Sequence, residues 1–165
     1  MKIIVAVDKN NGIGFENQLP WKCKEDMAHF RMTTSGHIVV MGYNTWQSVG
    51  ALKNRINIVY NPKAIESEFL EDCYLINNII DVRITSALLE LYGSKDTFII
   101  GGAKTYERFL NSQFVDEIIL TRINEEHKCD TFFYIPSGWE IQKTIKLSER
   151  ATVEYYGYSG RQNEK

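Results

Sequence analysis

The chain reads Gly-Ile-Gly-Phe-Glu-Asn-Gln-Leu-Pro-Trp-Lys-Cys-Lys-Glu-Asp-Met-Ala-His-Phe from Gly12 to Phe30, and the predicted fold is organised around this stretch. Two glycines, Gly12 and Gly14, give its first part the backbone freedom that suits an exposed loop. Pro20 favours an extended conformation at the residue before it, so a helix can begin only further on. The spacing then becomes helical and predicts a helix over about Lys24–Thr34.

One carboxylate, that of Asp26, stands on the apolar face of this predicted helix. Asp26 precedes Phe30 by four residues and Met27 precedes it by three, so the three side chains share a face. An acid in the first helical turn is ordinarily explained by the positive end of the helix dipole. Leu19 and Trp21 add an apolar wall, however, and a buried carboxylate needs a hydrogen-bonding partner. A flat ligand with two parallel N–H donors would supply that partner, and both interpretations stay open.

Length and composition favour a single domain that binds a small ligand. A chain of 165 residues is long enough to bury one core, which predicts one domain over 1–165. The formal charge of -2 without a basic stripe argues against nucleic acid as a partner. The dispersed cysteines and histidines predict free thiols in a reducing compartment and no metal site. The apolar run Ile3–Val7 is too short to span a membrane, so we expect a soluble, cytoplasmic protein.

Apolar runs that alternate with helical patterns predict an α/β fold. Continuous β-branched runs are typical of strands buried on both faces, and the strand-helix-strand order implies right-handed parallel crossovers. The last part of the chain alternates polar with apolar residues, which predicts an antiparallel hairpin on one edge of the sheet. The expected strands are Ile3–Val7, Ile38–Met41, Ile56–Tyr60, Tyr74–Ile76, Thr97–Ile100, Glu117–Thr121 and the hairpin within Trp139–Tyr158, with a loop over 63–72 and an amphipathic helix that Gly93 ends.

Glycines follow two of these strands and precede helices. Gly42 comes before a short helix that Asn44 or Thr45 can cap, and Gly101-Gly102 comes before a helix that begins near Ala103. Each junction offers backbone amides and a positive helix end to a phosphate, beyond the carboxyl ends of the strands where such sheets bind ligands. A double glycine is often only a tight turn, and the spacing is neither G-x-G-x-x-G nor a P-loop. Two junctions together favour one long ligand with two phosphate contacts, a dinucleotide.

Several segments carry a resemblance to a known family. They are Val7–Trp21, Asp26 with Phe30, Met41–Trp46 (Met-Gly-Tyr-Asn-Thr-Trp), Ile100–Ala103 (Ile-Gly-Gly-Ala) with Tyr106, and Asp130–Phe133. In order and spacing they resemble the dihydrofolate reductase family, over nearly the whole chain. The resemblance implies an α/β single domain with a mixed, mainly parallel eight-stranded sheet, four helices and an antiparallel C-terminal hairpin. It also implies NADPH-dependent reduction of 7,8-dihydrofolate to tetrahydrofolate for one-carbon and thymidylate metabolism.

The resemblance assigns roles in substrate binding and catalysis. Asp26 resembles the acid that binds N3 and the 2-amino group of the pterin and favours protonation at N5, with Thr121 bonded to both. Trp21 resembles the residue that holds an ordered water, and Leu19 the lid side chain over the nicotinamide. Arg55 stands where the family clamps the glutamate α-carboxylate, although a solvated turn arginine is the alternative. The implied walls of the folate slot are Ile4, Ala6, Met27, Phe30, Val49, Leu52 and Ile100.

The resemblance also assigns the binding of NADPH. Residues implied at the nicotinamide and its ribose are Ala6, Ile13, Gly14, Asn17 and Gln18. Those implied at the phosphates and the rest of the cofactor are Gly42, Tyr43, Asn44, Thr45, Ile100, Gly101, Gly102, Ala103, Lys104, Thr105 and Tyr106. Asp130 resembles the acid in a neighbouring loop that holds the lid closed. No metal, nucleic acid or membrane is implied, and the family analogy suggests a monomer.

Two positions depart from the family pattern. Tyr43 stands where Arg or Lys usually helps to bind the 2'-phosphate, and Lys63 or Lys104 could substitute, so we expect NADPH rather than NADH. Lys53-Asn54 replaces a common Pro-Gly turn, which Asn tolerates because it adopts a left-handed backbone. The rivals are a riboflavin-pathway reductase acting on a phosphoribosylaminopyrimidine, which would not need Asp26 together with Arg55, and a non-catalytic nucleotide-binding domain.

Overall fold

Two of the predicted buried strands, β3 (Ile38–Gly42) and β4 (Ile56–Tyr60), pair in parallel in the computed structural model, which describes residues 1–161. Their register runs from Ile38 opposite Ile56 to Gly42 opposite Tyr60. β7 (Thr97–Gly101) pairs in parallel with the other side of β3, and β6 (Tyr74–Ile76) pairs in parallel with β4. The prediction of parallel strands joined by helical crossovers is confirmed for this part of the chain.

The chain divides into two compact units, which we describe separately. The first unit comprises Met1–Lys2 and Met32–Val115. The second comprises Ile3–Arg31 and the chain from Asp116 onward. A single domain over 1–165 stays a prediction, and its last residues, 162–165, lie outside the described part of the chain.

The first unit contains strands in the order β7-β3-β4-β6-β5. β5 (Glu68–Phe69) pairs antiparallel with β6 in a region where we expected only a loop. Its helices are α2 (Tyr43–Val49), α3 (Ile79–Gly93) and α4 (Ala103–Leu110). The core that supports the candidate site consists of Val39, Met41, Val59, Cys73 and Leu75, against which Tyr43, Trp46, Leu52 and Ile100 pack.

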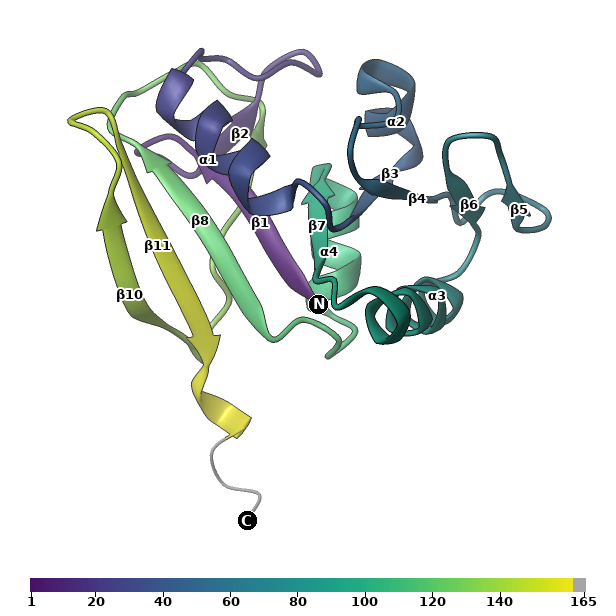
Figure 1. Ribbon diagram of the computed structural model, residues 1–165. Coiled ribbons are helices and arrows are strands. Elements are labelled where there is room, and N and C mark those ends of the chain that lie inside the picture. Colours follow the sequence, from purple (N-terminus) through teal and green to yellow (C-terminus); the bar gives the residue numbers. More distant parts are fainter. Residues whose placement is uncertain (162–165) are drawn as a thin grey trace. The chain divides into compact units, whose positions relative to one another are not determined.

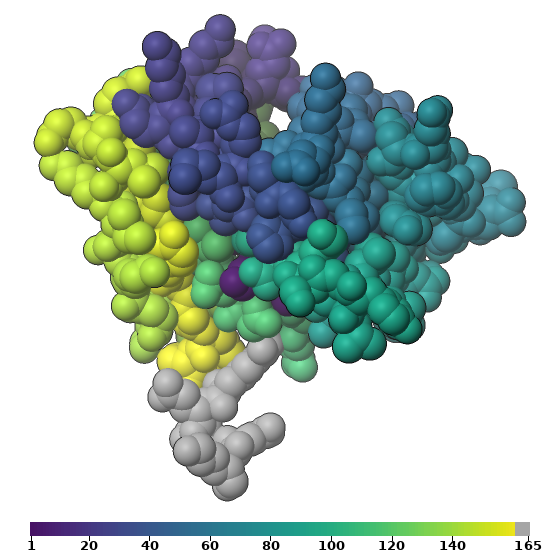
Figure 2. Space-filling model, in the orientation of Figure 1, coloured from purple at the N-terminus to yellow at the C-terminus, as the bar shows by residue number. Residues whose placement is uncertain are grey.

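The helix ends of the first unit differ from two expectations. α2 begins at Tyr43 with Gly42 as its N-cap and no capping side chain, so the predicted cap at Asn44 or Thr45 is wrong. The strand leads directly into the helix there, and both residues fall inside its first turn. α3 includes Gly93 and ends at Ser94, whose φ of 49° is left-handed. One side of α3 is exposed at the surface, teal in Figure 2, and carries Ile84 and Leu88.

The second unit contains strands in the order β10-β11-β8-β1, and β8, β11 and β10 lie side by side in Figure 1. β1 is Lys2–Val7 and β8 is Glu117–Ile123. β10 (Trp139–Lys146) and β11 (Ala151–Tyr158) form the predicted antiparallel hairpin, with β10 as its exposed strand. β11 pairs antiparallel with β8, and β8 lies between β11 and β1.

A second, two-stranded sheet in the same unit was not predicted. β2 (Gly12–Gly14) pairs antiparallel with β9 (Thr131–Phe132) and joins segments more than a hundred residues apart. α1 (Lys24–Thr34) has the predicted bounds. A short 3₁₀ turn, Ser159–Arg161, ends the described chain. Besides β2 and β9, residues 1–161 hold nine strands rather than eight, because the two-residue β5 is added.

Two further expectations concern the cysteines and the membrane. Cys23, Cys73 and Cys129, which all lie in the described part, are free thiols. Among residues 1–161, the helices are too short or too polar to cross a bilayer.

Candidate active site

Asp26 lies in the first turn of α1, half-buried, and the hydroxyl of Thr121 on β8 donates a hydrogen bond to its carboxylate. Burial raises the pKa of Asp26 above its ordinary value, and the bond from Thr121 opposes this without reversing it. Thr121 is itself 1% exposed, so its hydroxyl is directed by the fold and not by solvent. Burial therefore outweighs the hydrogen bond in setting the pKa of Asp26, and the acid does not project into bulk water.

The neighbours of Asp26 on α1 differ in solvent exposure. Phe30 is half-buried but Met27 is 62% exposed, so the face that they share with Asp26 is only partly covered by the protein. The thioether of Met27 remains a flexible apolar group open to a ligand.

Trp21 is buried against Cys23, Ile123 and Ala151, with Ala6 at the edge of the same cluster. Its indole Nε1 is buried and has no hydrogen-bond partner within the described protein atoms. A buried N–H that lacks an acceptor costs free energy unless a water or ligand atom accepts from it. The indole thus meets the geometric requirement for holding an ordered water.

The segment before Trp21, residues 12–20, is called the lid here, and it turns at residues other than those predicted. Phe15 and Gln18 exchange backbone hydrogen bonds of 2.9 and 3.0 Å, and Glu16 and Asn17 between them have φ of 49° and 61°. This is the left-handed pair that a tight hairpin turn requires. Gly12 and Gly14 do not have positive φ, so the expectation that their backbone freedom shapes the loop is wrong.

Close approach explains Gly12 instead. A Cβ at Gly12 would collide with the thiol of Cys129 and come within 2.7 Å of the Cys129 Cβ. The loop that contains Cys129 therefore packs directly on the backbone where the lid begins.

Asp130 forms hydrogen bonds with the lid segment on both sides of Phe15. Its Oδ2 accepts from the backbone N of Glu16 at 3.0 Å, and its own N donates to the carbonyl of Gly14 at 2.9 Å. The Thr131 hydroxyl donates to Oδ1 at 2.9 Å. The amide of Glu16 is the main cause of a lowered pKa at Asp130. Because the carboxylate is exposed, water competes for these bonds and the lid contact is reversible.

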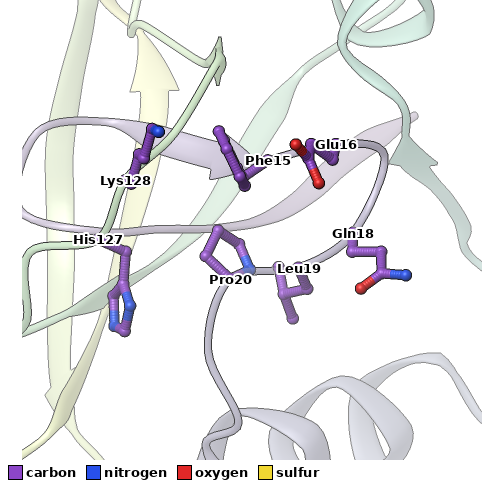
Figure 3. Close-up of a pocket in the computed structure, with 7 residues that line it drawn as sticks. All are labelled: Phe15, Glu16, Gln18, Leu19, Pro20, His127 and Lys128. Atoms are coloured by element: carbon purple, nitrogen blue, oxygen red, sulfur yellow. The ribbon is translucent and has the colours of Figure 1, made fainter.

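A cavity of about 400 Å³ lies under the lid segment in the second unit. In Figure 3 the side chains of Leu19, Gln18 and His127 extend to one side of the loop, and Phe15 and Lys128 to the other. Leu19 is 51% exposed, as a side chain that closes over a ligand would be. His127 and Lys128 were not predicted from the sequence, and the full lining is Phe15, Glu16, Gln18, Leu19, Pro20, His127 and Lys128.

The two glycine junctions of the first unit come together as predicted. A Cβ at Gly42 would collide with the hydroxyl of Thr105, and one at Gly102 would lie 3.4 Å from the Thr45 hydroxyl. Each glycine thus faces a threonine of the other junction. The absence of side chains leaves backbone amides and two hydroxyls at the start of α2 and α4, which is the donor set that phosphates prefer.

The remaining cofactor residues differ in exposure. Tyr43 is half-buried with its ring 5.6 Å from that of Trp46, which ties it to the core. Asn44, Lys104 and the distant Lys63 are exposed. The partly exposed residues are Ile13, Gly14, Thr45, Ile100, Gly102 and Ala103. Two more, Asn17 and Gln18, are exposed. The buried ones are Gly101, Thr105 and Tyr106.

Arg55 is positioned by two contacts. Its Nε donates to the hydroxyl of Thr34 at 3.2 Å and its Nη1 to the carbonyl of Lys53 at 3.0 Å, so the fold directs the guanidinium. Asn54 has a φ of 59°, which confirms that the turn survives without Pro-Gly. Of the other implied slot residues, Ile4 is buried, Ala6, Leu52 and Ile100 are partly buried, and Val49 is 55% exposed.

Asn57 was missed by sequence reasoning. It is buried and exchanges two hydrogen bonds of 2.9 Å with the backbone of Leu52, which closes the turn that carries Leu52 and Arg55. A single amide inside the apolar run Ile56–Tyr60 was the available signal, since buried polar groups require partners.

Comparison with known proteins agrees with this arrangement. The family model described as dihydrofolate reductase matches residues 1–160. The chain is 32% identical to the dihydrofolate reductase of Staphylococcus aureus (strain MSSA476) over 161 residues, which cover 94% of this chain and 93% of that protein. It is also 32% identical over 159 residues to the bifunctional dihydrofolate reductase-thymidylate synthase of Paramecium tetraurelia, of whose length it spans only 32%.

A solved structure has the same fold. Dihydrofolate reductase from Enterococcus faecalis, complexed with NADP(H) and RAB-propyl, superposes with a TM-score of 0.77 at 23% identity over 95% of both chains.

An α/β fold with paired glycine junctions and a half-buried acid is typical of nucleotide-dependent oxidoreductases. Since the family model matches almost the whole described chain, the chain belongs to the dihydrofolate reductase family. The activity of this family is the NADPH-dependent reduction of dihydrofolate.

Proposed function

We propose that this chain reduces 7,8-dihydrofolate to 5,6,7,8-tetrahydrofolate and that Asp26 is its catalytic acid. The observation that carries the proposal is the half-buried carboxylate of Asp26, which accepts from Thr121 and has a raised pKa. Its two oxygens match the parallel N–H donors at N3 and the 2-amino group of a pterin. A carboxylate so placed favours the electronic form of the pterin in which N5 is basic enough to take a proton.

Trp21 and Leu19 complete the proton and hydride steps. The buried, unpartnered indole N–H of Trp21 is suited to hold the water that brings the proton to N5. Leu19, on the lid, excludes other water from the reacting rings, which strengthens the electrostatic contacts inside the site. The lid bonds of Asp130 hold this segment in place during the step.

The residues proposed for the binding of dihydrofolate are apolar side chains and one cation. The aliphatic and aromatic residues Ile4, Ala6, Met27, Phe30, Val49, Leu52 and Ile100 bind the pterin and the benzoyl ring by apolar contact. Arg55, whose guanidinium is directed by Thr34 and Lys53, pairs with the α-carboxylate of the glutamate tail.

The glycine junctions fit NADPH. Gly42 and Gly102 with Thr45 and Thr105 supply the amides and hydroxyls for its phosphates, because a side chain at either glycine would fill the space. Ala6, Ile13, Gly14, Asn17 and Gln18 lie on the segments proposed for the nicotinamide end. When bound, the cofactor supplies the hydride that the pterin takes at C6. At position 43 the family usually has Arg or Lys, which binds the 2'-phosphate, and this chain has Tyr43. Lys63 or Lys104 would bind the 2'-phosphate instead.

We further propose that residues 1–165 act as one domain, in the cytoplasm and as a monomer. Free thiols at Cys23, Cys73 and Cys129 support a reducing compartment. The match of one family model to both units supports the single domain. The monomer rests on the family alone.

The test is the decrease of the NADPH absorbance band on adding dihydrofolate, with the phosphoribosylaminopyrimidine of the riboflavin pathway as a second substrate. We expect a decrease with dihydrofolate only, which is faster with NADPH than with NADH, and a rate about 10²–10⁴-fold lower for Asp26→Asn. Decay with the aminopyrimidine alone would identify the rival reductase. NADPH binding without decay for either substrate would identify a non-catalytic domain.

A further inference from the structure

A partly buried ion pair links the sheet of the second unit to the turn that precedes the lid. Arg122 follows Thr121 on β8 and reaches in two directions. Its Nε donates to Oε1 of Glu154 on β11 at 2.7 Å. Its Nη1 donates to Oδ1 of Asn11 at 3.2 Å and lies 3.4 Å from the carbonyl of Asp8. One guanidinium thus joins two strands to the 8–11 turn.

The sheet end of this link is fixed on both sides. In the register of β8 and β11, Glu154 lies opposite Leu120 and Arg122 opposite Thr152, so Arg122, Glu154 and Tyr156 share a face. Glu154 is 8% exposed, and its second oxygen accepts from the hydroxyl of Tyr156 at 2.9 Å. A buried acid whose oxygens are both engaged holds its partner cation in one orientation.

The turn at the other end is rigid in itself. Asp8 is 1% exposed, and its carboxylate accepts from the backbone N of Gly12 at 2.8 Å, of Asn10 at 2.9 Å and of His127 at 3.0 Å. Asn11 has a φ of 64°, and its carbonyl accepts from the N of Phe133 at 2.8 Å. The next residue begins β2, from which the lid continues.

The lid is held in two different ways. The bonds of Asp8 and Glu154 are buried or partly buried, whereas the bond between Glu16 N and Asp130 is exposed. Exposed bonds exchange with water and buried ones persist. The lid tip can therefore open while the 8–11 turn keeps its place on the sheet.

We propose that Arg122 is a positioning residue for the reaction, which holds the 8–11 turn through Asn11 so that the lid leaves the sheet in the direction that brings Leu19 over the substrate. The proposal rests on the proposed function. A displacement of about 1 Å of a closing element can lower the rate about 10²-fold without loss of binding, because the reacting atoms must be close and aligned.

Three variants of the turn separate positioning from general stability. Asn11→Gly removes the acceptor for Arg122 but tolerates the left-handed backbone and leaves the pair with Glu154 intact. Asn11→Asp restores an acceptor at the same place. Asn10→Gly is the matched control, because it loosens the unfolded chain equally and Asn10 contributes only its backbone N to the bonds described.

We expect Asn11→Gly to lower the single-turnover rate of NADPH oxidation at saturating dihydrofolate about 10-fold or more, with the Kd of dihydrofolate changed less than about 2-fold. Asn11→Asp and Asn10→Gly should keep the rate within about 2-fold of the native protein. Amide hydrogen exchange at residues 12–16 should become faster in Asn11→Gly alone. An unchanged rate in Asn11→Gly, or an equal loss in Asn10→Gly, would overturn the proposal.

The exchange measurement does not depend on turnover, so the two proposals fail separately. A native protein that does not oxidise NADPH with dihydrofolate would refute the proposed function. Faster exchange at residues 12–16 in Asn11→Gly alone would still support the link to the turn, and equal exchange in all variants would refute it.

Discussion

The hydroxyl of Thr121 donates a hydrogen bond to the carboxylate of Asp26, and yet the pKa of Asp26 lies above its ordinary value. The bond favours the ionised acid, while partial removal from water disfavours it by more. Asp26 therefore carries a penalty in the folded protein that its neighbours do not cancel. A group of this kind, unfavourable for stability and directed by a buried hydroxyl, is typical of a functional site.

The first prediction concerns activity. Asp26→Asn keeps the size and the contact with Thr121 but removes the carboxylate, so we expect kcat to fall about 10²–10⁴-fold near neutral pH. The KM for NADPH should hardly change, because Asp26 is assigned to the pterin. Steady-state kinetics with both substrates varied measures this. Full activity in Asp26→Asn would contradict the assignment.

The second prediction concerns stability and its sign. Because the folded pKa of Asp26 is raised, ionisation costs the folded state more than the unfolded state. Its contribution to the free energy of unfolding therefore falls as pH rises from the ordinary aspartate pKa of 3.8 through the folded pKa, and stays low above it. Asp26→Asn lacks this loss, so above that window it should have the higher Tm, as thermal denaturation against pH would show. A lower Tm for Asp26→Asn than for the native protein at neutral pH would contradict this prediction.

Asp8 gives the opposite behaviour. Burial alone would raise its pKa, but the amides of His127, Gly12 and Asn10 together lower it. Its stabilising contribution is therefore present above the ordinary aspartate pKa of 3.8 and is lost as pH falls through the folded pKa. Asp8→Asn replaces one acceptor oxygen by an NH2 donor, so at least one of the three amides loses its acceptor, and the free energy of unfolding should fall by about 1–3 kcal/mol near neutral pH. Urea denaturation tests this, and a variant as stable as the native protein would contradict it.

Tyr43 allows a test of cofactor choice. Tyr43→Lys places a cation where the family usually has one, and we expect the NADPH to NADH ratio of kcat/KM to rise about 10-fold or more. Gln47→Lys adds the same charge further along α2, where it is exposed, and serves as the control. An equal rise in both variants would mean that general charge, not position 43, sets the preference. Lys104→Ala should lower the ratio if Lys104 substitutes for the missing cation.

The sequence was informative where local chemistry decides the outcome. The apolar run Ile38–Met41 and the bounds of α1 were predicted almost residue by residue, because continuous β-branched runs and helical spacing have one common structural solution. Asp26 was found because an acid on an apolar face is conspicuous. The two glycine junctions were also recognised, and their mutual approach in the first unit agrees with the parallel pairing of β3 and β7.

Other features depend on partners that are distant in sequence. Asp8 looked only like the charged end of a strand, since the amide of His127 that it binds is 119 residues away. The pairing of Arg122 with Glu154 requires the register of two strands, which no local pattern gives. Gly12 was attributed to backbone freedom because the thiol of Cys129 that excludes a side chain there is invisible without coordinates.

The most direct test of the account is the pH dependence of the single-turnover rate of NADPH oxidation by dihydrofolate, compared between the native protein and Asp26→Asn. We predict that the native rate follows one ionisation whose pKa lies above the ordinary value of an aspartate, and that Asp26→Asn is slower and lacks this ionisation. The same ionisation at a similar rate in both proteins would show that Asp26 is not the acid on which the reaction depends.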